Sequence, residues 1–303
     1  MLVLTDADVR AAVTPDEVVD LMAAALVESY RGSLVSPPRP TIPAGGTQFT
    51  VTAGGRPGGI AGFRVYGAWG PGSDQLTAVW SPEGRLIGIV LGATLGTYRT
   101  GGLGGAAVRT LARGDATTLG VIGSGTIAWG QVWAACATRS FARVDIHSPT
   151  TGRREEFARR VEAELGVEAH SVADPEAVVA DHDVLIVSTT STSQVFRAEW
   201  LSPGTHVSST GPKGAGASEL DPQLAALAAV VASDSPQQVA AMGSWFSPRG
   251  VDHLGAIIAG ELVGRTTADQ ITLYCSIGLS GTEVVLGDWL LGKAAETRTS
   301  DSG

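Results

Sequence analysis

The sequence predicts an α/β fold in which a Rossmann-type, doubly wound parallel sheet is inserted into an α+β domain. From about residue 116 to 260, short apolar strands alternate with helical segments, which is typical of a parallel sheet covered by helices. Before residue 100 the strands alternate in polarity and are separated by Pro and Gly turns, which is typical of an antiparallel sheet.

The N-terminal part has the pattern of two helices followed by strands. Thr5 and Thr14 each precede an acidic first turn, and Pro15 follows Thr14, as is usual where helices begin. Four strands are expected next, over 48–52, 60–66, 76–80 and 86–90. A glycine-rich helix is expected over 99–113, and its glycines indicate a close approach to another helix or to a cofactor.

The inserted domain is expected to alternate strand and helix throughout. Its strands are expected over 119–122, 144–147, 184–188, 205–209 and 230–233, and its helices over 126–138, 152–165, 175–180, 221–227 and 236–242. The segments 271–276 and 283–295 are expected to rejoin the first domain, and the polar tail 296–303 is expected to be disordered. The predicted domains are therefore 1–113 with 271–303, and 114–270.

A glycine-rich turn connects the first strand of the inserted domain to its first helix. This G-x-G-x-x-A run has the spacing of a dinucleotide fingerprint, in which a helix N-terminus binds the pyrophosphate. A glycine-rich turn without a ligand is the alternative. The residues expected to contact the cofactor here are Gly123, Ser124, Gly125, Thr126 and Ile127.

The second strand ends at His147 without the acidic residue that usually holds the ribose 2′-hydroxyl of NAD. Ser148, Thr150 and Arg153 follow, and hydroxyl and guanidinium groups suit a 2′-phosphate, so the sequence predicts NADP(H). An exposed first helical turn would also explain Arg153. The residues expected beside the nicotinamide ribose, at the end of a later strand, are Ser188, Thr189 and Thr190.

Composition argues against several other classes of protein. The net charge of −9 and the lack of a basic block make nucleic acid an unsuitable partner. No apolar run has the length of a membrane span and no export signal is visible, so we expect a cytoplasmic protein without a membrane partner. The two cysteines are isolated and the five histidines are scattered, so no metal site is expected.

An ordered set of motifs along nearly the whole chain resembles the ornithine cyclodeaminase/mu-crystallin family. The set comprises Pro38-Arg39-Pro40, Arg99-Thr100, Leu119–Ala128 with Gln131, Ser188–Ser191, Trp200–His206, Glu219-Leu220-Asp221, Asp234-Ser235, Gly260–Leu262 and Ser276-Ile277-Gly278. The resemblance implies hydride transfer between a nicotinamide and the α-carbon of an amino or imino acid. It also implies a homodimer, with the first domain forming the interface and binding the substrate.

The resemblance assigns roles to residues of the first domain. By position, Arg39 and Arg99 match two arginines that hold the substrate carboxylate, although either could be a structural ion pair. Arg64 stands where the family has a catalytic lysine, and arginine does not shuttle protons but can orient or polarise a bound group. Glu283 matches an aspartate near the family's active site, with a role in the first helical turn as the alternative. Thr77 is a further candidate for substrate binding.

Lys213 stands where cyclodeaminases have the aspartate that holds a distal ammonium group, which argues against cyclodeamination of ornithine or lysine. A desolvated lysine has a lowered pKa and is a candidate acid or base, while a solvated loop lysine is the alternative. Tyr66 and Tyr98 are further candidates for a proton donor. Thr100 and Gly211 complete the expected cofactor contacts.

Together these features predict an NADPH-dependent oxidoreductase that acts on a C=N/CH–NH group. Its substrate would be a cyclic ketimine or imino acid, reduced by hydride transfer in specialised metabolism. Two alternatives remain: a cyclodeaminase of the ornithine or lysine type that recycles its cofactor, and a non-catalytic protein that binds NADP(H) or a small ligand.

Overall fold

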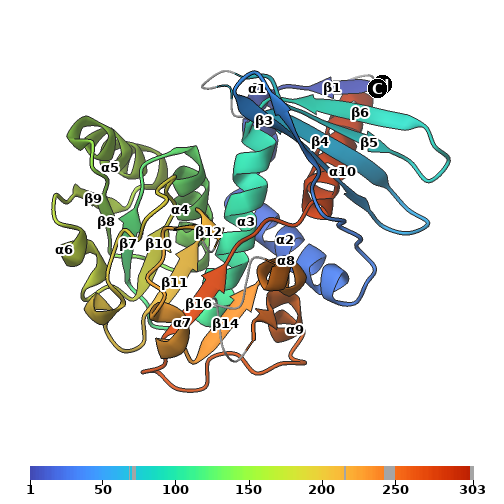
Figure 1. Ribbon diagram of the computed structural model, residues 1–303. Coiled ribbons are helices and arrows are strands. Elements are labelled where there is room, and N and C mark those ends of the chain that lie inside the picture. Colours follow the sequence, from blue (N-terminus) through green and yellow to red (C-terminus); the bar gives the residue numbers. More distant parts are fainter. Residues whose placement is uncertain (68, 70–72, 215, 242–249, 301–303) are drawn as a thin grey trace. The chain divides into compact units, whose positions relative to one another are not determined.

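The structure is a computed structural model that describes residues 1–67, 69, 73–214, 216–241 and 250–300 (Figure 1). The chain divides into two compact units. Unit 1 comprises Met1–Arg99 and Leu279–Gly303, and unit 2 comprises Thr100–Gly278. Each of these units contains a large sheet of its own.

Unit 1 is built on a six-stranded sheet with the order β1-β6-β5-β4-β3-β2. The strands are β1 (Leu2–Leu4), β2 (Thr41–Ala44), β3 (Thr47–Gly55), β4 (Ala61–Gly67), β5 (Leu76–Trp80) and β6 (Leu86–Leu91). All pairs are antiparallel except β1 with β6. The four expected strands are confirmed. The sequence did not predict β1, which has three residues, or β2, an edge strand that contains Pro43.

Three helices accompany this sheet: α1 (Asp6–Ala12), α2 (Pro15–Tyr30) and α10 (Gly281–Ser300). The expected caps are confirmed, because Thr5 and Thr14 each form a capping box at the start of their helix. Helix α10 contacts β3, β4, β5 and α2. It continues through residues 296–300, which the sequence assigned to a disordered tail, because no Gly or Pro interrupts the helix after Lys293.

Unit 2 contains an eight-stranded sheet with the order β15-β14-β16-β11-β10-β7-β8-β9, and all of its pairs are parallel. Its strands are β7 (Thr118–Ile122), β8 (Arg143–His147), β9 (Glu168–Ser171), β10 (Val184–Val187), β11 (His206–Ser209), β14 (Val230–Ser233), β15 (Asp252–His253) and β16 (Thr272–Cys275). A short hairpin, β12 (Lys213–Gly214) with β13 (Ala217–Ser218), follows β11. The predicted α/β fold with a doubly wound parallel sheet is confirmed.

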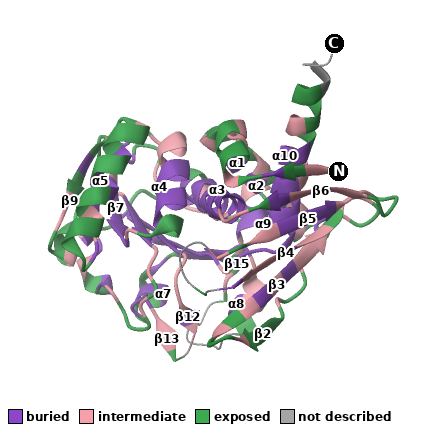
Figure 2. Cartoon of the chain, turned by 90° about the horizontal axis from the view of Figure 1, so that it is seen from above, coloured by how far each residue is buried: buried purple, intermediate pink, exposed green. Residues whose placement is uncertain are grey.

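The helices of unit 2 are α4 (Thr126–Thr138), α5 (Thr151–Leu165), α6 (Pro175–Val179), α7 (Leu224–Leu227), α8 (Pro236–Ala241) and α9 (Leu254–Ile258), with a 3₁₀ turn at Ala198–Trp200. The five expected helices are present. The expected end of the last one, Met242, lies outside the described residues. Strands β9 and β15 and helix α9 are short and were not predicted. Figure 2 shows α4 largely buried, whereas α5 has an exposed outer face.

Two parts of the chain lie in a different unit from the one expected. Strand β16 does not rejoin the first domain but lies between β14 and β11 in the parallel sheet, where Leu273, Tyr274 and Cys275 are fully buried. A short run that is apolar on both faces is typical of a central parallel strand. Residues 100–111 of α3 (Thr94–Leu111) also belong to unit 2.

The glycines of α3 allow a close approach to helix α4. A Cβ atom on Gly101 would lie 2.2 Å from the carbonyl oxygen of Gly130, and one on Gly104 would lie 1.8 Å from the side chain of Gln131. The side chain of Gln131 also donates to the carbonyl of Thr100 at 2.7 Å. Of the two explanations that the sequence left open, close packing against a helix therefore applies to these two glycines.

The strand order also fixes where a ligand site is expected in unit 2. Strand β7 lies between β8 and β10, so the chain leaves β7 toward one edge of the sheet and later returns to its other side (Figure 1). This reversal is a topological switch point, and the crevice outside the carboxyl ends of the strands there is the usual place for a ligand.

Candidate active site

A pocket of about 680 Å³ lies at the carboxyl ends of β7, β8 and β10. It is lined by Ile122, Gly123, Ser124, Gly125, Thr126, Ile127, His147, Ser148, Pro149, Thr150, Arg153, Ser188, Thr189, Thr190, Ser191, Val195 and Thr210. All the residues expected to contact the cofactor are in this set except Thr100 and Gly211. The pocket therefore coincides with the switch point and with the fingerprint.

The glycine turn at the centre of the pocket has the geometry that a pyrophosphate requires. Gly123 has a φ of +117°, and a Cβ atom there would lie 2.1 Å from the carbonyl oxygen of Ser188. Gly125 is the N-cap of α4, provides no side-chain cap, and has open space where a Cβ would stand. The N-terminus of this 13-residue helix thus borders the pocket without a side chain on its cap residue, and it fits a phosphate group.

The end of the pocket beside β8 is lined by hydroxyl groups and a guanidinium. Arg153 lines it, whereas the adjacent Arg154 donates to Ser171 Oγ and to the carbonyl of Ser148, each at 3.1 Å. Asp145, the acidic residue of β8, instead contacts the ring of His182 at 3.0 Å. Among the described residues that line the pocket there is no carboxylate. Arg154 therefore supports the loop and Arg153 is available to a ligand.

The opposite end of the pocket is formed by the loops after β10 and β11. Besides the predicted Ser188, Thr189 and Thr190, it includes Val195 and Thr210, which the sequence analysis missed. Thr210 directly follows β11, and a residue at the carboxyl end of a parallel strand can be expected to border the ligand site. Gly211 does not line the pocket, because its N–H and carbonyl are used by Glu219 and Lys213.

In unit 1 the structure brings together Arg64 of β4, Arg99 of α3 and Glu283 of α10, all of them buried. Arg64 Nη1 donates to Glu283 Oε1 at 2.7 Å, and Arg99 donates to the same oxygen. Thr52 donates to the other carboxylate oxygen. The structure thus brings together three residues that the resemblance assigns to the substrate site, and the carboxylate that the two arginines hold belongs to the protein itself.

These contacts determine the ionisation of Glu283. Burial raises the pKa of this carboxyl group, but the charges of Arg99 and Arg64 and the hydrogen bonds from Thr52 and Arg64 outweigh burial and lower the pKa to about 2. Arg64 also donates to Gln75 and lies over the ring of Tyr66. The cluster is thus an ionised network that fixes the orientation of the Arg64 guanidinium group.

The structure places two further candidates of unit 1 differently. Thr77 on β5 is buried and stands opposite Arg64 in the strand pairing. Arg39 is partly buried in the segment between α2 and β2.

Lys213 in unit 2 is buried, with 3% of its surface exposed, and its Nζ donates to the carbonyl of Gly211 at 2.5 Å. It is therefore not the solvated loop lysine that was the alternative. Burial lowers its pKa, while Cys275, Glu219 and Asp234 act in the opposite direction. Lys213 does not line the pocket at the switch point.

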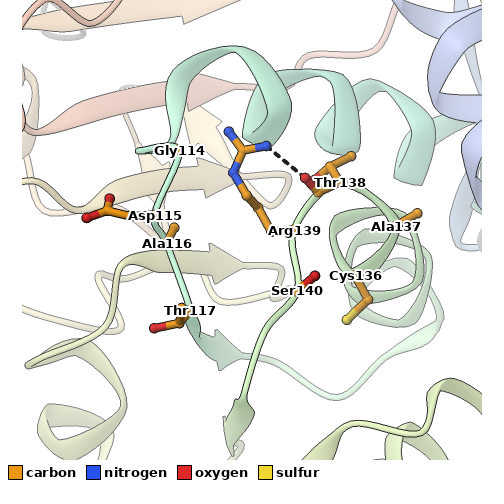
Figure 3. Close-up of a pocket in the computed structure, with 9 residues that line it drawn as sticks. All are labelled: Gly114, Asp115, Ala116, Thr117, Cys136, Ala137, Thr138, Arg139 and Ser140. Carbon is orange, nitrogen blue, oxygen red and sulfur yellow. Dashed lines mark hydrogen bonds between the residues drawn. The ribbon is translucent and has the colours of Figure 1, made fainter.

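A second pocket of about 400 Å³ lies near the amino end of β7, away from the switch point (Figure 3). Arg139 is its prominent cation, but this side chain donates to the carbonyls of Thr138 and Arg113 at 2.7 and 3.1 Å. Burial raises the pKa of Cys136, also in this pocket, to about 12. The charged and thiol groups here are thus committed or inert, and the pocket at the switch point is the better candidate.

No helix within the described ranges is long and apolar enough to cross a membrane. In the same part of the chain, no three His, Cys, Asp or Glu side chains gather in a way that would hold a metal ion. Cys136 and Cys275 are free thiols.

Comparison with known proteins identifies the class. The pattern of the ornithine cyclodeaminase/mu-crystallin family matches residues 76–296, and the chain belongs to this family. A Δ1-pyrroline-2-carboxylate reductase of Bacillus cereus is 28% identical over 98% of this chain and 97% of that protein. An alanine dehydrogenase of Archaeoglobus fulgidus is 31% identical over 68% of this chain and 66% of that protein. These relatives confirm the predicted class of enzyme, an oxidoreductase.

A solved structure supports the same assignment. An archaeal alanine dehydrogenase, solved as a dimer with bound NAD, superposes with a TM-score of 0.89 at 27% identity over 98% of this chain and 97% of that chain. The family predicted from the motifs is therefore confirmed.

Proposed function

We propose that the chain is an NADPH-dependent reductase of a cyclic ketimine or imino acid. The observation that carries this proposal is the pocket at the switch point, with a glycine turn at its centre, Arg153 at one end and hydroxyl side chains at the other. The Bacillus cereus relative, named for the reduction of a cyclic imino acid, supports the same reaction. When bound, the reduced nicotinamide supplies the hydride that is added to the imine carbon.

The preference for NADPH rests on the end of the pocket beside β8. Gly123, Ser124, Gly125, Thr126 and Ile127 would hold the pyrophosphate, while His147, Ser148, Thr150 and Arg153 would surround the 2′-phosphate of the adenosine. A guanidinium forms charge-assisted hydrogen bonds to a phosphate, and no described lining residue is a carboxylate that would repel it. The archaeal neighbour was solved with NAD, so a preference for NADH over NADPH is the result that would contradict this proposal.

Substrate binding is proposed for unit 1, with Arg39, Arg64, Arg99 and Thr77 contacting the imino acid. Glu283 keeps the guanidinium of Arg64 in one orientation, and an oriented guanidinium binds a carboxylate with less loss of conformational entropy. Positioning of this kind and stabilisation of the developing charge supply most of the expected rate enhancement.

Reduction of C=N also needs a proton on the nitrogen, and Lys213 is the proposed source. Its buried amine has a lowered pKa, so it gives up a proton more readily than an exposed lysine does. The C=N π electrons form the new N–H bond as the hydride adds to carbon, so atoms and charges balance.

We further propose that unit 2 binds the dinucleotide and that unit 1 also forms the interface of a homodimer, as the dimer of the archaeal neighbour suggests. The replaced residues at 64 and 213 favour a substrate of specialised metabolism. The two free thiols agree with a reducing, cytoplasmic environment.

The test follows NADPH absorbance with purified protein, pyrroline-2-carboxylate, piperideine-2-carboxylate, and pyruvate with amines. NADPH consumption with one of these, faster than with NADH, is the expected result. Release of ammonia from ornithine or lysine without net change in cofactor would instead identify a cyclodeaminase. Saturable NADPH binding without turnover on any substrate would identify a binding protein.

A further inference from the structure

Glu219 is a buried carboxylate to which the proposed reaction gives no role. It stands in the loop after β13, it is 0% exposed, and it does not line the dinucleotide pocket. Its Oε2 nevertheless binds Thr189, which lines the pocket, and its Oε1 binds Ser209 and Gly211, which flank the lining residue Thr210. In the sequence it belongs to the Glu219-Leu220-Asp221 motif, to which no role was assigned.

The carboxylate of Glu219 accepts four hydrogen bonds from two different loops. Oε2 accepts from the N–H and the hydroxyl of Thr189, each at 2.9 Å, in the loop after β10. Oε1 accepts from Ser209 Oγ and from the N–H of Gly211, each at 2.6 Å, at the end of β11 and in the loop after it. Four donors match the full acceptor capacity of an ionised carboxylate.

The main chain of Glu219 repeats the same connection. Its N–H donates to the carbonyl of Pro212 at 2.9 Å, and its carbonyl accepts from the N–H of Val195 at 3.0 Å. Thr189 and Val195 line the pocket, and so does Thr210, whose neighbour Gly211 is held by the carboxylate. One residue thus joins the two loops through six hydrogen bonds.

The packing around this carboxylate leaves little room for adjustment. A Cβ atom on Gly211 would lie 2.1 Å from Glu219 Oε2 and 2.4 Å from the carbonyl of Thr189. Thr210 also donates to Ser188 Oγ at 2.8 Å, which adds a second link between the loops. The loops are therefore fixed to each other by side-chain contacts, because they are not themselves part of the sheet.

The loops held by Glu219 form one end of the pocket only. The proposed adenosine end of the pocket lies beside β8 and includes Arg153, at the start of α5. A dinucleotide places its nicotinamide half on the other side of the switch point, beside β10 and β11. We propose that Glu219 is a positioning residue that holds the nicotinamide half of the cofactor in its reactive orientation, and this inference rests on the proposed function.

The test separates the two halves of the cofactor. Calorimetry measures the binding of NADP⁺ and of 2′,5′-ADP, which carries the adenosine and its 2′-phosphate but no nicotinamide. In Glu219→Gln the amide nitrogen faces hydrogen-bond donors that it cannot accept from. We expect NADP⁺ to bind to this variant about tenfold more weakly than to the wild type, which is the loss that one or two neutral hydrogen bonds represent. The affinity for 2′,5′-ADP should stay within about twofold of the wild type.

Two further variants separate positioning from loss of structure. Asp221→Asn removes a buried carboxylate two residues away, whose bonds to Ala198 and Gln223 do not reach the pocket, and it should leave both ligands unchanged. Ser209→Ala removes a single donor to Glu219 without altering the pocket lining, and should weaken NADP⁺ alone, by a few-fold. In turnover, Glu219→Gln should lower kcat and leave the KM for the imine unchanged.

Equal weakening of both ligands in Glu219→Gln, or no change in either, would overturn the positioning role. If the wild type binds NAD⁺ in preference to NADP⁺, only the proposed cofactor preference fails, and the same comparison is made with NAD⁺ and ADP. If the wild type binds neither dinucleotide, the proposed function fails and the inference fails with it.

Discussion

Glu283 in unit 1 and Glu219 in unit 2 are both fully buried carboxylates, but their surroundings differ in kind. Glu283 is held by two guanidinium groups and one hydroxyl, whereas Glu219 is held by hydroxyl and backbone N–H donors. A carboxylate paired with cations orients groups that can bind a further anion. A carboxylate held by neutral donors fixes the shape of loops instead. This difference matches the two proposed roles, substrate binding in the first region and positioning of the cofactor in the second.

The largest effect is expected from Glu283→Gln, which leaves Arg64 and Arg99 buried without their shared anion. Removing one partner of a buried ion pair costs about 3–5 kcal/mol of unfolding free energy. Urea unfolding monitored by circular dichroism measures this loss. Glu219→Gln should lose less, about 1–3 kcal/mol, since only neutral donors are left unsatisfied. Equal losses in the two variants would contradict the distinction between the regions.

Lys213 extends the comparison to a buried cation that donates to a neutral carbonyl, that of Gly211. We expect Lys213→Met to lower kcat about 100-fold, the usual contribution of a general acid, and to leave the free energy of unfolding unchanged or higher. Stopped-flow measurement of NADPH oxidation gives kcat, and Lys293→Met serves as a control, since Lys293 pairs with Glu17 in unit 1. A kcat within twofold of the wild type would exclude Lys213 as the proton source.

The two units should also differ in their sensitivity to acid. Burial, and more weakly the charges of Arg265 and Arg139, lower the pKa of His206 in unit 2 from 6.5 to about 3. The unfolded chain therefore binds the extra proton, and stability falls as pH decreases below 6.5, by about 2 kcal/mol at pH 5.

The pKa of Glu283 is lowered from 4.5 to about 2, so its contribution is complete above pH 4.5 and is lost only below that value. Urea midpoints at pH 7, 6 and 5 for the wild type and His206→Gln measure the difference. The variant should lose most of the slope above pH 5. A slope that persists in His206→Gln would assign the acid sensitivity to another group.

The smallest effect is expected from two neighbouring arginines of unit 2: Arg153 lines the pocket, and Arg154 binds the loop at Ser148. Arg153→Ala should reduce the preference of kcat/KM for NADPH over NADH about tenfold, equivalent to about 1.4 kcal/mol, through loss of a charge-assisted hydrogen bond. Arg154→Ala should weaken both cofactors alike, because its side chain supports the carbonyl of Ser148. Steady-state kinetics with each cofactor would contradict this if Arg154→Ala alone changed the preference.

Local sequence patterns predicted the elements well where the signals are short-range. The capping boxes at Thr5 and Thr14, helix α4 and the central strands follow from residues within a few positions of one another. Strand β1 and the placement of β16 did not follow, because a strand acquires its place from partners distant in sequence. The polar residues 296–300 predict a disordered tail, whereas α10 continues through them in the structure.

By itself, the sequence determined the family, the inserted Rossmann fold, the fingerprint at Gly123 and Gly125, and the absence of an acid after His147, since each is a matter of residue type and spacing. Only the tertiary structure decided that Arg154 supports a loop while Arg153 faces the pocket, that Lys213 is buried, and that Glu219 and Glu283 are held by different kinds of donor. These properties arise from contacts between segments up to 231 residues apart, and no local pattern encodes which donors will surround a buried carboxylate.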